Sequence, residues 1–189
     1  AFEDEHGTYI MNSKDLRAVQ HVERLVRMGV HSLKIEGRTK SHFYVARTAQ
    51  VYRRAIDDAL AGKPFDPSLL GSLESLAHRG YTEGFLRRHV HDEYQNYERG
   101  SSLAERQQFV GELTGERRGE LVEVRVKNRF TVGDGLELMT PQGNLRFALE
   151  QLQNAQGQAL SVAPGDGHVL YLPLPAEVQL EYGLLMRDL

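Results

Sequence analysis

The chain has 189 residues, of which 40% are hydrophobic and 26% charged, and a formal net charge of −3. These values are typical of a globular protein of one domain or two small ones. The sequence has no apolar run of about eighteen residues and no secretory signal, so we expect a cytoplasmic protein without a membrane segment. The absence of cysteine excludes disulfides, thiolate metal sites and cysteine nucleophiles within these residues. Because the chain begins abruptly at Ala1 rather than at Met, we expect a fragment of a longer protein.

The basic residues are mostly arginine, 18 of 23. The slightly negative net charge gives no overall attraction to nucleic acid, but arginine forms bidentate pairs with phosphate and stacks on bases. Adjacent arginines occur at Arg53-Arg54, Arg87-Arg88 and Arg117-Arg118. Two interpretations stay open: an RNA-facing surface, or helix surfaces covered with ion pairs.

Strand and helix signals alternate in the first 80 residues. β-prone residues predict a short strand at 7–11, and an apolar stripe at helical spacing predicts a helix over about 13–28. A second short strand is predicted at 31–36. Helices are then predicted over 41–61 and about 66–80, each followed or closed by a glycine.

Residues 81–106 are irregular and polar, and we expect a connector with short helical turns. Tyr94 and Tyr97 either anchor this connector by packing or stack on bases. The His89-x-His91-Asp92 pattern has the residue types of a metal site, but we interpret it as a solvated loop. No metal site is therefore predicted.

From residue 107 the pattern changes to short strands separated by turn residues. Apolar and polar residues alternate most clearly at 121–126. This spacing of strands and turns predicts a small antiparallel barrel or sandwich. The expected strands are 109–113, 121–126, 136–139, 145–149, 159–162, 168–172 and 178–186.

The strand predicted after the first helix carries the clearest functional signal. Leu33 and Ile35 lie on one face, whereas Ser32, Lys34 and Glu36 lie on the other. Helical patterns flank this strand, so we expect it in a parallel sheet, where strands are covered on both faces and almost wholly apolar. Its polar face predicts a polar pocket at the end of the strand. The alternative is a neutralising pair of Lys34 and Glu36 on an edge or solvated strand.

Glu36 and Lys34 are therefore the predicted catalytic residues. Lys34 would hold an anionic group, and Glu36 would accept a proton or bind a hydroxyl. Arg38, just past the strand, would bind a carboxylate or phosphate, or only bridge to Glu36. Ser41 and Tyr44 begin the next helix, where backbone N–H groups would face the same anion, and they complete the predicted substrate-binding set.

Candidates for RNA contact lie in the second half of the chain. The turn after the strand at 121–126 carries Lys127 and Arg129, and Arg117, Arg118 and Arg125 lie close to it in sequence. Small barrels serve as RNA platforms in other proteins, but the fold alone does not imply that function.

Several motifs resemble the collagenase-like peptidase family U32, and in particular its tRNA-hydroxylating members. They are NSKDL at 12–16, SLKIEGRTKS at 32–41, YVA at 44–46, YR at 52–53 and RGYTEGF at 79–85. The resemblance covers nearly the whole chain. It implies a multidomain α+β protein whose N-terminal part is a TIM-like β/α barrel. Residues 1–63 would be the last β/α units of that barrel, 64–106 a helical and irregular connector, and 107–189 a C-terminal antiparallel β-barrel.

The resemblance also implies a reaction, the prephenate-dependent 5-hydroxylation of the wobble uridine of tRNA, which begins the synthesis of 5-carboxymethoxyuridine. The partners would be tRNA, prephenate and the protein's own N-terminal barrel. The two carboxylates of prephenate suit Lys34 and Arg38. Relatives carry cysteines to which an iron–sulfur cluster is attributed; this chain has none, so we expect any such cluster in the N-terminal part.

Two alternatives to this reaction remain. The chain could be an RNA-binding module without catalysis, or part of a collagenase-like protease. For the protease, the sequence offers no cysteine, no Gly-x-Ser-x-Gly elbow and no His-Glu-x-x-His motif. We expect the fragment alone to be inactive, because one strand of a barrel wall cannot enclose a pocket.

Overall fold

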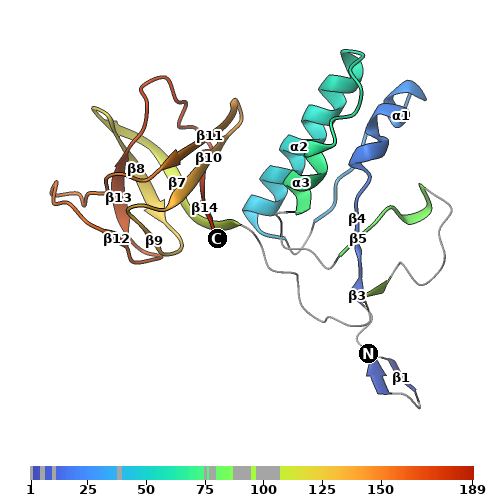
Figure 1. The fold of residues 1–189 in the computed structure, drawn as a ribbon, viewed down its shortest axis with the longest axis horizontal. Helices are drawn as coiled ribbons and strands as arrows, with labels where there is room; N and C mark the ends of the chain where they lie inside the picture. The colour runs from blue at the N-terminus through green and yellow to red at the C-terminus, as the bar shows by residue number, and fades with distance from the viewer. Residues whose placement is uncertain are drawn as a thin grey trace. The chain divides into compact units, whose positions relative to one another are not determined.

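The computed structural model describes residues 2–4, 7–9, 12–37, 40–74, 76, 80–86, 95–96 and 107–189 (Figure 1). The chain divides into two compact units, called here unit 1 (Ala1–Glu105) and unit 2 (Arg106–Leu189). Their boundary lies beside the change from helical to strand patterns in the sequence. No helix in these ranges is long and apolar enough to cross a membrane.

The described helices of unit 1 pack around α2. The elements are the 3-10 turn η1 (Val19–His21), α1 (Val22–Arg27), α2 (His42–Leu60), α3 (Ser68–Glu74) and the 3-10 turn η2 (Gly84–Leu86). Helix α2 starts where the sequence predicts, because the Ser41 hydroxyl accepts a hydrogen bond from the Tyr44 N–H at 3.2 Å and caps the helix. It buries Phe43, Val51 and Ala55 and contacts both α1 and α3.

Three short strand pairs complete the described part of unit 1. They are β1 (Phe2–Asp4) with β2 (Gly7–Tyr9), β3 (Asn12–Ser13) with β6 (Gln95–Asn96), and β4 (Asp15–Leu16) with β5 (Tyr81–Thr82). The first two pairs are antiparallel and the third is parallel. In the parallel pair, the Asp15 N–H donates to Gly80 and the Arg17 N–H donates to Thr82. This pairing holds the side chains of Asp15 and Arg17 near Tyr81.

Three predictions for unit 1 are wrong. Residues 30–37 have no regular secondary structure, so the strand predicted at 31–36 is not formed. A strand needs hydrogen bonds from a neighbour, and none of the strands that the structure describes pairs with this segment. The helix predicted over 13–28 is also shorter, because residues 12–16 pair as β3 and β4 and the helical turns begin only at Val19. The last helix ends at Glu74 rather than near residue 80.

Unit 2 contains a six-stranded sheet in the order β11-β10-β14-β7-β8-β13, with every neighbouring pair antiparallel. Its strands are β7 (Gln107–Arg118), β8 (Leu121–Val126), β10 (Gly135–Thr140), β11 (Gly143–Ala148), β13 (Val169–Pro173) and β14 (Leu184–Asp188). A second pair joins β9 (Phe130–Thr131) to β12 (Val162–Ala163). The antiparallel β architecture predicted from residue 107 onward is confirmed.

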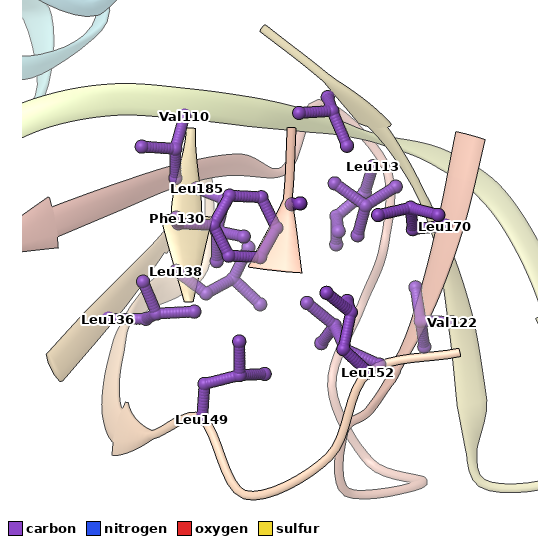
Figure 2. Packing of buried hydrophobic residues seen from close by; sticks show 14 of the residues in the cluster. Val110, Leu113, Val122, Phe130, Leu136, Leu138, Leu149, Leu152, Leu170 and Leu185 are labelled. Atoms are coloured by element: carbon purple, nitrogen blue, oxygen red, sulfur yellow. The ribbon is translucent and has the colours of Figure 1, made fainter. Parts of the chain in front are cut away.

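The core of unit 2 is one continuous hydrophobic cluster. Figure 2 shows Phe130 among leucines and valines contributed by several strands, including Val110, Leu138 and Leu185. The ladder runs from edge strand β11 to edge strand β13, and these two strands do not pair with each other in residues 107–189. A closed C-terminal barrel is therefore not confirmed. The TIM-like barrel also stays a prediction, because unit 1 contributes only the parallel pair β4–β5 within its described residues.

Candidate functional site in unit 1

A cavity of about 410 Å³ lies in unit 1. It is bounded by β4 and the residues after it, by residues 32–36, by Lys40 and α2, and by Tyr81 of β5. The volume is in the range of small-molecule binding sites. Its polar lining residues are Asp15, Arg17, Ser32, Lys34, Glu36, Lys40, Tyr44, Thr48, Tyr52 and Tyr81.

Asp15 is the centre of a small polar network in this cavity. Its Oδ2 accepts a hydrogen bond from Lys40 Nζ at 2.6 Å and another from the Tyr44 hydroxyl at 3.3 Å. The Lys40 ammonium also lies 4.5 Å from the centre of the Tyr44 ring, where a cation is attracted by the ring face. Asp15 and Lys40 are both mostly buried, so their pair is less screened by water than a surface pair.

Three tyrosines of the cavity stay protonated. Burial raises the pKa of Tyr44 well above its usual range, and the nearby Asp15 carboxylate raises it further. Burial likewise raises the pKa values of Tyr52 and Tyr81. The Tyr81 hydroxyl donates to the Leu73 carbonyl at 2.6 Å, and the Tyr52 hydroxyl accepts from the Ala18 N–H at 2.9 Å. All three phenols therefore act as neutral hydrogen-bonding groups.

Arg17 and Thr48 leave polar atoms unpaired beside the cavity. The Arg17 guanidinium lies 4.6 Å from the centre of the Tyr81 ring, and its Nη1 contacts Glu74 at 3.2 Å. Its Nε, however, is buried without a hydrogen-bond partner in the described part of the chain. The same is true of the Thr48 hydroxyl. Such buried, unpaired donors are uncommon and point to a missing acceptor.

The predicted catalytic residues lie at this cavity but are open to solvent. Lys34 Nζ and Glu36 Oε2 are 3.5 Å apart, and their side chains are 85% and 68% exposed. This is the neutralising pair that the sequence offered as the alternative to a buried polar face. Both residues line the cavity. Their catalytic role stays a prediction.

The predicted substrate-binding residues are only partly brought together. Tyr44 lies in the cavity beside Asp15, whereas the Ser41 hydroxyl is used to cap α2. Arg38 lies outside the described residues. The same holds for the pattern of His89, His91 and Asp92 and for the tyrosines predicted to anchor the connector, Tyr94 and Tyr97.

The arginines predicted to contact RNA differ sharply in their surroundings. Arg117 donates to the carbonyls of Leu174, Pro175 and Val178, which ties β7 to the segment after β13. Arg118 lies with its guanidinium 4.4 Å from the centre of the Tyr171 ring. Both arginines therefore have structural partners, and their predicted contact with RNA stays untested.

The other predicted RNA-binding cations, Arg125, Lys127 and Arg129, lie on β8 and just after it. Arg125 and Lys127 each lie 3.9 Å from Glu112 Oε2, too far for a short ion pair. Arg129 is exposed in the turn after β8. These three side chains remain available to an external anion, so they are the stronger candidates of the predicted set.

Sequence reasoning missed Asp15, Arg17, Lys40 and Thr48. Asp15 and Arg17 are two positions apart, and a strand places such residues on the same face. On the helix predicted over 13–28 the two residues would lie on different faces, so the sequence pattern did not indicate that they share a site. Within the described ranges, no group of three His, Cys, Asp or Glu side chains could hold a metal ion.

Comparison with known proteins places the chain in a family. The model of peptidase family U32 matches residues 1–96, and that of the U32 C-terminal domain matches residues 105–187. The chain is 72% identical over 188 residues to "tRNA hydroxylation protein P" of Escherichia coli, covering 100% of this chain and 42% of that protein. The same-named protein of Haemophilus influenzae is 66% identical over 190 residues, covering 100% and 41%.

A more distant relative has a different name. A Porphyromonas gingivalis protein called "Collagenase" is 24% identical over 151 residues, covering 78% of this chain and 35% of that protein. The chain thus spans about two-fifths or less of the length of these three relatives. The resemblance drawn from the motifs is confirmed: the chain belongs to peptidase family U32.

Proposed function

We propose that the chain is the C-terminal part of a tRNA-hydroxylating protein. The observation that carries the proposal is the 72% identity, over the full length of this chain, to a protein named for tRNA hydroxylation. The proposed reaction is prephenate-dependent 5-hydroxylation of the wobble uridine, the first step toward 5-carboxymethoxyuridine. The proposed substrates are tRNA and prephenate.

The cavity of unit 1 supports this proposal chemically. It offers cations, neutral phenols and carboxylates around a volume suited to a small molecule. In the proposal, Lys34 and Glu36 work at its rim, where Lys34 attracts an anionic group and Glu36 accepts a proton or binds a hydroxyl. Both would need partners from the rest of the protein, because they are exposed in this chain.

Unit 2 would contribute to holding tRNA. Arg125, Lys127 and Arg129 lie on β8 and in the turn after it, and their side chains are not used in short ion pairs. Cations of this kind bind the phosphate backbone without reading its sequence. We therefore assign the RNA contact to this group ahead of Arg117 and Arg118.

The proposed iron–sulfur cluster does not fit this chain. Such clusters are held by cysteine thiolates, and the chain has no cysteine. The proposal therefore places the cluster, with the remaining strands of the TIM-like barrel, in the N-terminal part of the protein. No step of the reaction is assigned to it here.

Mass spectrometry of tRNA nucleosides tests the proposed reaction. An Escherichia coli strain lacking its 72% identical relative is complemented with the full-length form of the present protein. We expect 5-hydroxyuridine derivatives to fall in the deletion strain and to be restored by the wild-type protein. Failure of the wild-type protein to restore them would overturn the proposal.

Variants in the same strain test the residue roles. We expect Glu36→Gln and Lys34→Gln to restore less than about a tenth of the modification, the scale of effect of a lost acid–base group. Arg27→Gln is the matched control, because Arg27 is an exposed residue of α1 that pairs with Glu23 of the same helix. Full restoration by both cavity variants would remove the catalytic assignment of Lys34 and Glu36.

A protease remains the second candidate, favoured by the 24% identity to the protein named "Collagenase" and by the 30% identity over 133 residues to an "Uncharacterized protease" of Methanocaldococcus jannaschii. The full-length protein is incubated with gelatin, with and without added divalent metal. Cleavage that is lost in Glu36→Gln would support a protease. Intact gelatin in both conditions would discard it.

A further inference from the structure

The charged residues that line the cavity include one more cation than anions, and Arg17 is the cation whose partner lies outside the lining. The charged lining residues are Asp15 and Glu36 against Arg17, Lys34 and Lys40, which gives the lining a net charge of +1. Lys40 is matched by Asp15, and Lys34 by Glu36. The partner of Arg17 is Glu74, which is 60% exposed and does not line the cavity. Water screens that pair, so the positive charge of Arg17 remains available to a ligand.

A buried hydroxyl provides the second, independent sign of a ligand. Thr48 is only 6% exposed, lines the cavity and has no hydrogen-bond partner for its Oγ1. Leaving a buried polar group unpaired is unfavourable, and a helical threonine usually satisfies its hydroxyl on the preceding turn. An acceptor atom supplied by a bound molecule would satisfy Thr48 and the buried Nε of Arg17.

The remaining lining fits an apolar body. Val22, Leu25, Leu33 and Leu73 line the cavity together with the rings of the tyrosines. An anionic group near Arg17 would thus be attached to a part of the ligand that contacts aliphatic and aromatic carbon. The side chains of Arg17 and Lys40 are only 17% and 20% exposed. Such recessed cations suit a small molecule better than the phosphates of a nucleic-acid backbone.

We propose that this cavity binds a small organic carboxylate, with its carboxylate held by Arg17 and the Thr48 hydroxyl and its apolar body against Leu33 and Leu73. This inference rests on the proposed function, whose co-substrate is an acid of this class. It adds the residues that hold the acid. The binding end lies at Arg17, just after β4, and at Thr48 on α2, rather than at the exposed pair of Lys34 and Glu36.

Calorimetric titration of the full-length protein tests the site. The probes are prephenate, phenylpyruvate and inorganic phosphate, and the variants are Arg17→Gln and Thr48→Val, with Arg27→Gln as control. We expect saturable binding of prephenate that weakens about tenfold or more in Arg17→Gln, the scale of one charge-assisted hydrogen bond. Thr48→Val keeps the shape of the side chain and removes only the hydroxyl, so we expect a smaller loss of several-fold.

The outcomes separate the inference from the proposed function. Wild-type affinity in both variants, or saturable binding of phosphate but of neither organic acid, overturns the carboxylate site. Thermal unfolding of each variant is measured in parallel, and Thr48→Val keeps the test open if Arg17→Gln does not fold. If tRNA hydroxylation fails to depend on the protein while prephenate still binds at Arg17, the proposed function fails and the site stands. If hydroxylation depends on the protein but both variants bind prephenate like wild type, the site alone fails.

Discussion

The two units differ in how they bury their hydrophobic side chains. In unit 2, strands distant in sequence enclose one continuous core around Phe130 and Leu138. In the described part of unit 1, apolar side chains such as Leu16, Val30 and Ile35 remain exposed. Exposed apolar residues near a cavity indicate a surface that another segment covers. Unit 2 has one continuous core of its own, and the exposed apolar side chains beside the cavity of unit 1 fit our proposal that unit 1 is one part of a larger barrel.

The units also use their polar residues differently. Arg117 in unit 2 satisfies backbone carbonyls, and Tyr171 donates to Glu123, which lowers the pKa of that carboxyl. In unit 1, Arg17 and Thr48 keep donors without partners beside a cavity, and in unit 2 the buried Nε of Arg187 also has no partner among the described residues. A polar group with all its partners supports the fold, and one without them is available for a ligand.

The largest expected effect on stability comes from a substitution in the core of unit 2. Phe130→Ala removes a fully buried ring and should lower the free energy of unfolding by about 3–5 kcal/mol. Urea denaturation of the 106–189 segment measures it, with Val169→Ala as an exposed control expected to change stability by less than about 0.5 kcal/mol. Equal stability of the two variants would contradict a close-packed core in unit 2.

The next effect separates structural from RNA-binding arginines in unit 2. Arg117→Gln removes charge-assisted hydrogen bonds to three carbonyls and should cost about 1.5–3 kcal/mol of unfolding free energy. Arg129→Gln, in an exposed turn, should cost less than about 0.5 kcal/mol. In tRNA titrations at several salt concentrations we expect the opposite ranking of the two variants. The salt dependence of the tRNA affinity should become shallower in Arg129→Gln and stay unchanged in Arg117→Gln. A shallower salt dependence of the tRNA affinity in Arg117→Gln instead would indicate that Arg117 contacts RNA.

Sequence predicted the parts of the fold that local signals determine. Helix α2 is found within its predicted range of 41–61 because its helical signals and the glycine that follows them lie within one continuous segment. Strand β8 is found at its predicted bounds because alternation over six residues needs no knowledge of the partner strand. The antiparallel arrangement of unit 2 follows from the regular spacing of its turns.

Sequence failed where pairing between distant segments decides the outcome. Residues 12–16 carry part of a helical stripe, yet they pair with β5 and β6, and this pairing places Asp15 and Arg17 at the cavity. Residues 31–36 have strand-like alternation but no described neighbour with which to pair. The sequence predicted a polar pocket beside residues 32–36, and a cavity lies there. It did not indicate Arg17 and Thr48, the side chains with unpaired donors.

A smaller effect tests whether the cavity network also supports unit 1. Asp15→Asn removes the charge that Lys40 and Tyr44 both contact, and should lower the stability of unit 1 by about 1–2 kcal/mol. Thermal unfolding of the full-length protein measures it. The control is Asp57→Asn, because Asp57 pairs with Arg53 on the exposed surface of α2, where ion pairs contribute about 0–1 kcal/mol. If the two variants unfold alike, the network around Asp15 serves the ligand site and not the fold.

The smallest expected effect is a pH dependence at the end of α2. Hydrogen bonds from Arg54 and Lys63 hold the pKa of the Asp58 carboxyl below its ordinary value of 3.8. A carboxyl whose pKa is lower in the folded state stabilises the protein above the ordinary pKa and loses that contribution as the pH falls through the lowered value. Asp58→Asn should therefore unfold at a lower temperature than wild type at neutral pH, and the difference should shrink below about pH 3.8. A difference that persists undiminished in strong acid would show that the packing of Asp58 against its neighbours, and not its charge, stabilises this end of the helix.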